Sequence, residues 1–107
     1  MNLAEFKSSL TQNDPPQTLS APLAALWWDA KGDWNRAHEL VDELETQDGM
    51  AVHAYLHRKG GQPDNADYWY ARAGRQHRRP TLEAERQSLT ESLLLPTVAT
   101  KYATADR

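Results

Sequence analysis

The segment ADYWYARAG, residues 66–74, decides the fold. Four of its residues lie at the helical offsets 0, 3, 4 and 7, namely Ala66, Trp69, Tyr70 and Ala73. A small side chain where two helices cross lets the backbones approach closely, and the aromatic rings fill the space beside it. Gly74 is a typical helix stop. The segment therefore predicts a helix, beginning near residue 63, that packs against another helix through its alanine side.

Two short turns indicate that the helices are paired into hairpins. A Lys-Gly dipeptide ends a helix at residues 31–32 and again at residues 59–60, and a new helix follows within a few residues each time. Ala37 and Ala66, the inner alanines of these following helices, are 29 positions apart, a spacing typical of two-helix solenoid units. Residues 21–74 are therefore predicted to form two stacked antiparallel hairpins.

The second helix of the first hairpin shows its own apolar pattern. Asp33 is a suitable N-cap, and the helix that follows has apolar residues at offsets 0, 3, 4 and 7. These residues are predicted to form one buried stripe: Ala37, Leu40, Val41 and Leu44.

Further helices are expected on both sides of the hairpins. An N-terminal helix over residues 1–12 would be stopped by Pro15-Pro16. Residues 81–95 predict a C-terminal helix that caps the stack. No window alternates β-branched and polar residues for long enough to form a strand. We therefore predict an all-α fold of five to six helices in a single domain over residues 1–96, with a flexible tail over 97–107.

The hairpin segments resemble a known repeat family. The run from Ala66 to Gly74 resembles the second helix of a SEL-type repeat, a relative of the tetratricopeptide repeat, and KGDWNRA at residues 31–37 resembles a tetratricopeptide hairpin turn. The chain is also similar to small uncharacterised bacterial helical proteins with a Trp-rich core. The resemblance implies a right-handed stack of helical hairpins that binds other proteins, and it implies no catalysis. The chain departs from the family in having two units and in carrying His53 and His57.

The composition excludes several classes of site. The chain has 107 residues, no cysteine and a net charge of −3. Disulfides, thiol catalysis and thiolate metal ligands are therefore excluded, and the charge is too small to demand a polyanionic partner. No apolar stretch approaches the roughly 18 residues of a membrane span, and the first residues do not read as a secretory signal. We expect a soluble, cytoplasmic protein without membrane contact.

Two histidines have the spacing of helical metal ligands. His53 and His57 lie four positions apart, so both imidazoles point the same way, and His38, Glu39 or Asp42 is placed to supply a third ligand. Alanine follows His53 where a helical zinc protease has glutamate, so that reaction is disfavoured. The preferred interpretation is two partly buried histidines bonded to neighbouring helices. The sequence therefore favours no metal or other cofactor and leaves His38, His53 and His57 as candidate ligands.

Charge is distributed unevenly along the chain. Residues 29–48 hold seven acidic and two basic side chains, whereas residues 53–79 hold six basic and two acidic ones. The basic segment Arg72-Arg79, close to Trp69, suits the phosphates and bases of single-stranded nucleic acid. The alternative is that its first arginines complement the helix dipole and the rest is a solvated linker. Nucleic acid is accordingly the third choice of partner.

The favoured function is a small helical-repeat module for protein–protein interaction. Two hairpins are fewer than a solenoid normally needs to cover its faces, so some aromatic surface is expected to stay open. Trp28 is a candidate for this open surface, and the alternative is that it packs against the N-terminal helix. The predicted partner is an acidic peptide or a second copy of the chain. Two other functions remain as alternatives: the chain is a metal-binding protein or enzyme that uses His53 and His57, or it binds single-stranded nucleic acid. The predicted binding residues are Trp28, His53, His57, Arg72 and Arg75. No phosphate loop, nucleophile elbow or triad spacing is present, so no catalytic residue is predicted.

Overall fold

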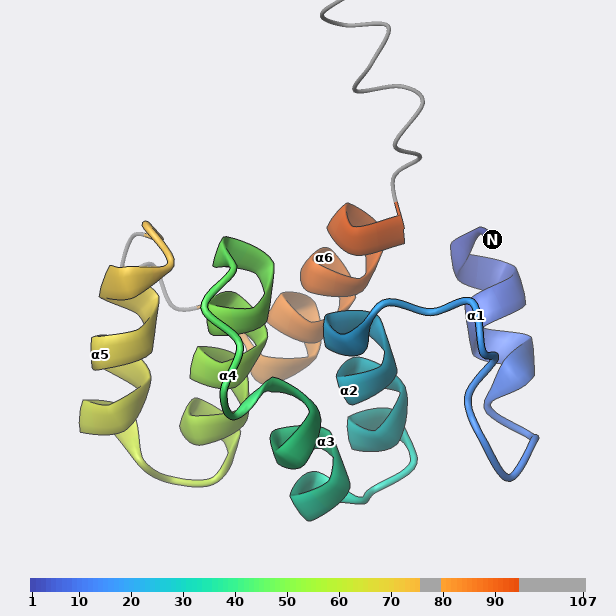
Figure 1. Ribbon diagram of the computed structural model, residues 1–107, viewed down its shortest axis with the longest axis horizontal. Coiled ribbons are helices and arrows are strands. Elements are labelled where there is room, and N and C mark those ends of the chain that lie inside the picture. Colours follow the sequence, from blue (N-terminus) through green and yellow to red (C-terminus); the bar gives the residue numbers. More distant parts are fainter. Residues whose placement is uncertain (76–79, 95–107) are drawn as a thin grey trace, which may run out of the picture.

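The computed structural model describes residues 1–75 and 80–94, and these form six helices without any strand. This confirms the all-α prediction. None of the helices in these ranges is long and apolar enough to cross a lipid bilayer. The helices, labelled in Figure 1, are α1 (Leu3–Ser9), α2 (Ala21–Ala30), α3 (Trp34–Val41), α4 (Gln47–Lys59), α5 (Pro63–Arg72) and α6 (Leu82–Leu94).

The two hairpin turns depend on glycine. Gly32, between α2 and α3, has a φ of 89°, and Gly61, between α4 and α5, has a φ of 81°. Glycine reaches this left-handed region without steric cost, so the chain reverses within three residues at both turns. In the second turn Gly60 is the C-cap and Gly61 is the left-handed residue. Side chains cap α2, α3 and α4 at their N-termini, as Ser20, Asp33 and Thr46 accept backbone N–H bonds.

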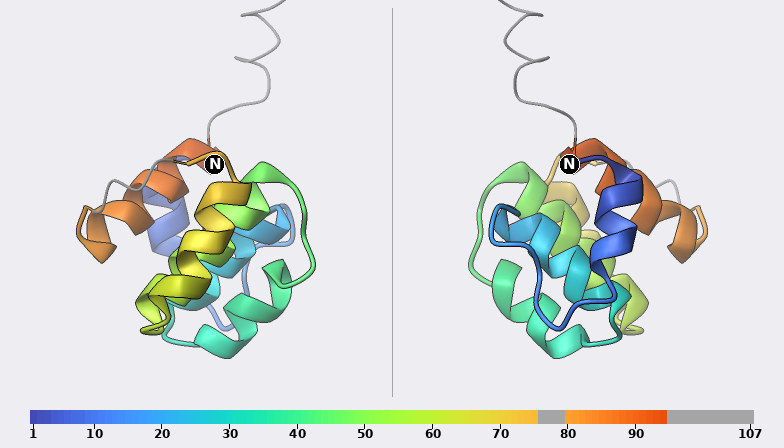
Figure 2. Two further views of the ribbon diagram at one scale, coloured as in Figure 1. Left: turned by 90° about the vertical axis from the view of Figure 1, so that its left-hand side faces the viewer. Right: turned by 90° about the vertical axis from the view of Figure 1, so that its right-hand side faces the viewer.

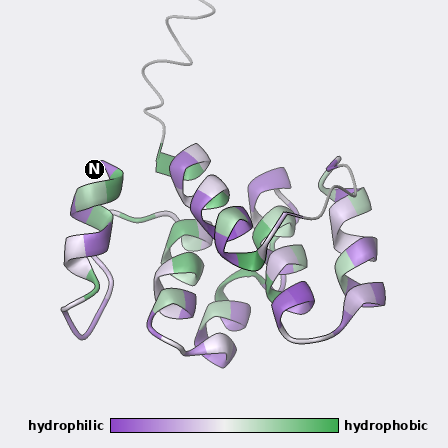
Figure 3. Ribbon diagram, turned by 180° about the vertical axis from the view of Figure 1, so that it is seen from behind, coloured by the Kyte–Doolittle hydropathy of each residue, from purple (hydrophilic) through white to green (hydrophobic). Residues whose placement is uncertain are grey.

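The hairpins α2–α3 and α4–α5 stand side by side (Figure 1), with α4 in contact with both α2 and α3. Figure 2 shows α3 and α6 on opposite sides of the molecule, so that α2 and α4 lie between them. The helix expected as a cap over residues 81–95 is α6, which crosses behind α2 and α4 and also contacts α1. Hydrophobic parts of α2, α4 and α6 turn toward one another (Figure 3). The largest fully buried side chains are Trp27, Tyr55, Leu26, Leu56, Val41 and Val52.

Buried polar side chains fix the two hairpins to each other. Asp29 of α2 accepts hydrogen bonds from the Tyr55 hydroxyl and the Lys59 ammonium of α4, both at 2.7 Å. Between the N-terminal helix and α2, the Trp27 indole N–H donates to the Ser9 hydroxyl at 2.9 Å. Because every one of these contacts is long-range in sequence, they fix the relative positions of α1, α2 and α4.

The buried stripe predicted for the first hairpin is wrong at Leu40. Helix α3 ends at Val41, and within it only Ala37 and Val41 are buried, whereas Leu40 is 36% exposed. Leu44 lies beyond the helix and is half-buried against the core. The physical reason is the short length of α3. Its two turns bury one i, i+4 pair, Ala37 and Val41, and leave Leu40, at i+3, at the edge of the buried face. The tail predicted over 97–107 lies outside the described residues.

Ala66→Leu is expected to destabilise the protein by about 1 to 3 kcal/mol. Ala66 is buried in α5 beside Ala54 of α4 and Tyr70, so a larger side chain would force the two helices apart. The measurement is urea denaturation, with Ala71→Leu as the control because Ala71 is on the exposed side of the same helix. Equal midpoints for the two variants would contradict the close approach of α4 and α5.

Candidate metal centre

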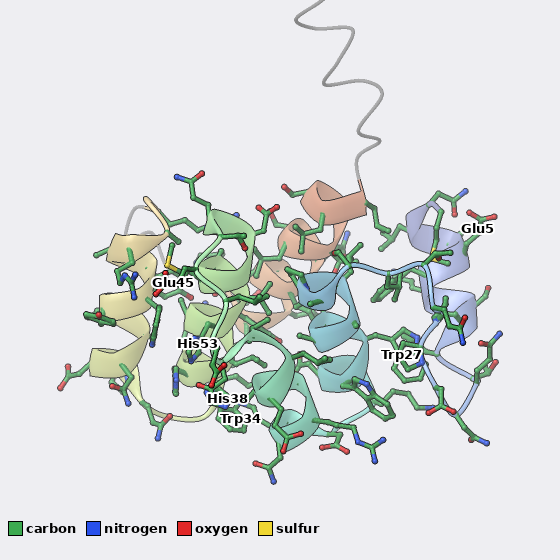
Figure 4. All side chains as sticks on the ribbon, viewed as in Figure 1. Glu5, Trp27, Trp34, His38, Glu45 and His53 are labelled. Carbon is green, nitrogen blue, oxygen red and sulfur yellow. The ribbon has the colours of Figure 1, made fainter. Side chains whose placement is uncertain are left out.

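Three histidines gather between α3 and α4. Ring nitrogens of His38, His53 and His57, one from each residue, lie within 4.8 Å of one another. The Nε2 atoms of His38 and His53 lie 3.1 Å apart, within hydrogen-bond distance. Figure 4 shows His53 and His38 together between the helices, with Trp34 beside them. The i, i+4 spacing predicts two of these histidines on one face, and the structure brings the third, His38, to them from the other hairpin.

Local helix geometry explains how the cluster assembles. His53 and His57 are one turn apart on α4, so their rings are stacked with centroids 4.8 Å apart. His38 lies in the second turn of α3, and the short connection through Thr46, which caps α4, folds α3 back against it. The cluster thus joins the two hairpins.

Two tryptophans enclose the imidazoles. Trp34 stacks on His38, with ring centroids 4.8 Å apart and an angle of 8° between the planes. Its indole N–H donates to the Leu56 carbonyl at 2.7 Å, which holds the ring in place. Trp69 of α5 stacks on His53, with centroids 4.2 Å apart. These rings restrict the rotation of two of the histidines and keep water from one side of the cluster.

His53 is an unusual buried residue, because it is only 2% exposed. Its Nδ1 atom is buried and has no hydrogen-bond partner in the part of the chain that the structure describes. Burial, together with the neighbouring imidazoles of His57 and His38, lowers the pKa of His53 from 6.5 to about 4. Burial also lowers the pKa of His38. Both rings are therefore neutral at pH 7, which is the form that binds metal ions.

Gln62 fixes the orientation of the third ring. The Nδ1 of His57 lies 2.5 Å from the Gln62 side-chain oxygen. That oxygen only accepts hydrogen bonds, so Nδ1 must carry the proton and donate, and Nε2 is then the atom with the free lone pair. Metal-binding histidines commonly hold their second nitrogen in this way. Gln62 precedes α5, so the second hairpin supplies both the ligand and its support.

The separations between the ring nitrogens suit a tetrahedral ion. Zinc–nitrogen bonds of about 2.0 to 2.1 Å place two ligand nitrogens about 3.3 Å apart in a tetrahedral site. The 3.1 Å between His38 and His53 is close to this value. The widest pair, at up to 4.8 Å, would have to close by about 1.5 Å. Half-exposed His57, together with its exposed partner Gln62, is the ring left to make such a movement, since Trp34 and Trp69 stack on the other two.

The other predicted binding residues lie at separate places. Trp28 is half-buried, with its edge against Trp27 and the Arg36 guanidinium over its face at 4.3 Å. Arg72 covers the rings of Tyr68 and Trp69, the second of which stacks on His53, while Arg75 is exposed beyond the end of α5.

The predicted protein-binding and nucleic-acid-binding surfaces stay predictions. The part of the basic segment over 76–79 lies outside the described residues.

Sequence reasoning missed the roles of Trp34, Trp69 and Gln62. Trp34 and His38 are four positions apart on one helix, and this spacing brings two rings into contact. Their stacking could therefore have been predicted from the sequence. For Trp69 and Gln62 no local signal exists, because their contacts with His53 and His57 arise from the pairing of α4 with α5.

Comparison with known proteins yields no relative from which a function would follow. No protein-family model, no curated protein and no solved structure matches this chain. The chemistry of the site is therefore the basis for assigning a function.

Proposed function

We propose that this protein binds a divalent transition-metal ion of the zinc class through His38, His53 and His57. The observation that carries the proposal is the convergence of three imidazoles, two of them neutral at pH 7, on one point between α3 and α4. Imidazole nitrogens suit zinc, copper and nickel, whereas magnesium and calcium prefer oxygen ligands. With no cysteine in the chain, the soft thiolate ligands are excluded.

Packing alone accounts poorly for this cluster. An imidazole that is buried with one nitrogen unpaired costs about 1 to 3 kcal/mol of desolvation, which an apolar side chain of similar shape avoids. Burial lowers the pKa of His53, and the neighbouring imidazoles of His57 and His38 lower it further. A cation coordinated through the ring nitrogens that face one another, Nε2 of His38 and of His53 among them, uses their lone pairs and replaces mutual repulsion by attraction. It does not pair the buried Nδ1 of His53.

The proposed role of the ion is to join the two helical hairpins. His38 belongs to α3 of the first hairpin, and His53 and His57 belong to α4 of the second. Binding therefore stabilises the packed state relative to any state in which α3 has left α4, since a separated hairpin retains at most two of the ligands. The free energy of metal binding becomes free energy of folding.

Zinc is expected to raise the thermal midpoint of tag-free, chelator-treated protein. At a free zinc concentration 100 times the dissociation constant, one site adds about 2.7 kcal/mol, or about 10 °C or more for a domain of this size. The measurement is thermal denaturation with and without zinc, combined with titration calorimetry for stoichiometry. We expect one ion per chain.

His38→Ala and His57→Ala provide the test of ligand identity. Both side chains are half-buried, so the helical fold should survive, but zinc affinity should fall at least about 10-fold in each variant. His77→Ala is the matched control, since it removes the one histidine of the sequence that is not among the three proposed ligands. If the three variants bind zinc as the unaltered protein does, the ion is held elsewhere and the proposal is wrong.

A further inference from the structure

We infer that Asp42 is the fourth ligand of this centre and that the site is consequently closed, with a structural rather than a catalytic metal ion. The inference rests on the proposed function of the three histidines. Structural zinc sites have four protein ligands, whereas catalytic sites have three and leave the fourth position to water or substrate. The identity of the fourth ligand thus determines what the ion can do.

Asp42 lies beside the cluster, one helical turn after His38. Asp42 follows His38 by four residues, one helical turn, and its backbone still has helical angles at the end of α3. Its Oδ1 atom lies 3.9 Å from the His38 Nε2 atom. Two ligands of one tetrahedral zinc ion lie about 3.3 Å apart, so relative to His38 the carboxylate would have to move by about 0.6 Å. The side chain is 54% exposed, which leaves it free to make that shift.

The charge of a divalent ion favours a carboxylate as the fourth ligand. Three neutral imidazoles leave the full charge of a divalent ion uncompensated beside a buried histidine, and this is costly in a medium of low dielectric constant. A carboxylate in contact halves the net charge. Asp42 acts electrostatically on both His38 and His53, raising the pKa of each against the effect of burial. Glu39 acts on His38 alone, and as the next residue on the helix it points about 100° away from it.

The remaining sides of the cluster are occupied by protein. Trp34 covers His38, Trp69 covers His53, and Gln62 bonds to His57. Asp42 is 54% exposed, so solvent reaches its side of His38, and the fourth position there is filled either by this carboxylate or by water. A carboxylate on the same helix as His38 has the advantage of proximity over water, because α3 has already fixed its position.

Cobalt substitution distinguishes the two cases. Co²⁺ replaces zinc in tetrahedral sites, and its visible absorption reports the coordination number and any exogenous ligand. We expect the full chain with one Co²⁺ to show an intense four-coordinate spectrum that azide does not change. Asp42→Asn should bind Co²⁺ at least about 10-fold more weakly, and azide should change its spectrum, since the fourth position is now held by exchangeable water. Glu39→Gln is the matched control and should behave as the unaltered protein.

Two results would overturn the closed site while leaving the three-histidine centre intact. One is a spectrum of the unaltered protein that changes with azide, and the other is an Asp42→Asn variant whose affinity and spectrum match those of Glu39→Gln. Failure of the proposed function has a different signature, because the unaltered protein would then give no protein-bound cobalt spectrum at all. That outcome would overturn both assignments together.

Discussion

Asp29→Ala is expected to lower the free energy of unfolding by about 2 to 4 kcal/mol. The variant leaves the buried Tyr55 hydroxyl without its acceptor and the Lys59 ammonium without its partner. Burial and the Asp29 carboxylate raise the pKa of Tyr55, so the hydroxyl stays protonated and depends on an acceptor at every working pH. Lys59 is partly exposed and keeps some hydration, which limits its share of the loss.

Urea denaturation measures this effect, with two comparison variants. Asp29→Asn keeps an oxygen for Tyr55 but removes the charge that pairs with Lys59, so its loss should be intermediate. Asp14→Ala, on the exposed connector before α2, should be neutral. A loss of less than about 0.5 kcal/mol for Asp29→Ala would mean that the tie between α2 and α4 contributes little. Because Tyr55 lies between His53 and His57 on α4, weakening this tie should also reduce metal affinity.

Metal-free protein is expected to lose about 2 kcal/mol of stability between pH 7 and pH 5 through His53. The pKa of His53 is about 4 in the folded state and about 6.5 in the unfolded chain, so only the unfolded chain takes up the proton in this range. The stabilising contribution is present above pH 6.5 and is lost as the pH falls toward 4. The pKa of His38 is lowered as well, so its effect on stability has the same sign. The Asp42 carboxylate acts against the lowering of the pKa at both rings.

The measurement is urea denaturation in the presence of a chelator at pH 7 and pH 5. His53→Phe is the comparison variant, since it keeps an aromatic ring against Trp69 and removes the titrating group. Its stability should depend less on pH than that of the unaltered protein. If the free energy of unfolding changes equally with pH in the two proteins, His53 is protonated in the folded state near its ordinary pKa.

The helices were predictable because each carries its own local signals. The apolar spacing of Ala66, Trp69 and Tyr70, and the left-handed glycines after α2 and α4, are features of short sequence windows. The error at Leu40 arose because a repeating apolar pattern does not state how many turns a helix will have. The buried Asp29–Tyr55 bond had no local signal, since its members are 26 positions apart.

The candidate site was predictable only in part, for the same reason. The i, i+4 spacing placed His53 and His57 on one face of a helix, and His38 was among three candidates for the third ligand. Choosing His38 over Glu39 required the crossing of α3 and α4, which brings the His38 and His53 nitrogens to 3.1 Å. The loss of solvent at His53, which keeps its ring neutral, is likewise a property of the assembled helices.

Nitrogen-15 NMR of the imidazole rings during a zinc titration tests the central claim most directly. The chain has four histidines, so one spectrum follows the three of the cluster together with His77 as an internal control. The account predicts that one equivalent of zinc shifts the coordinating nitrogens of His38, His53 and His57 and leaves those of His77 unchanged. Zinc shifts confined to His77, or no shift at the three clustered rings, would contradict the assignment of a metal centre between the hairpins.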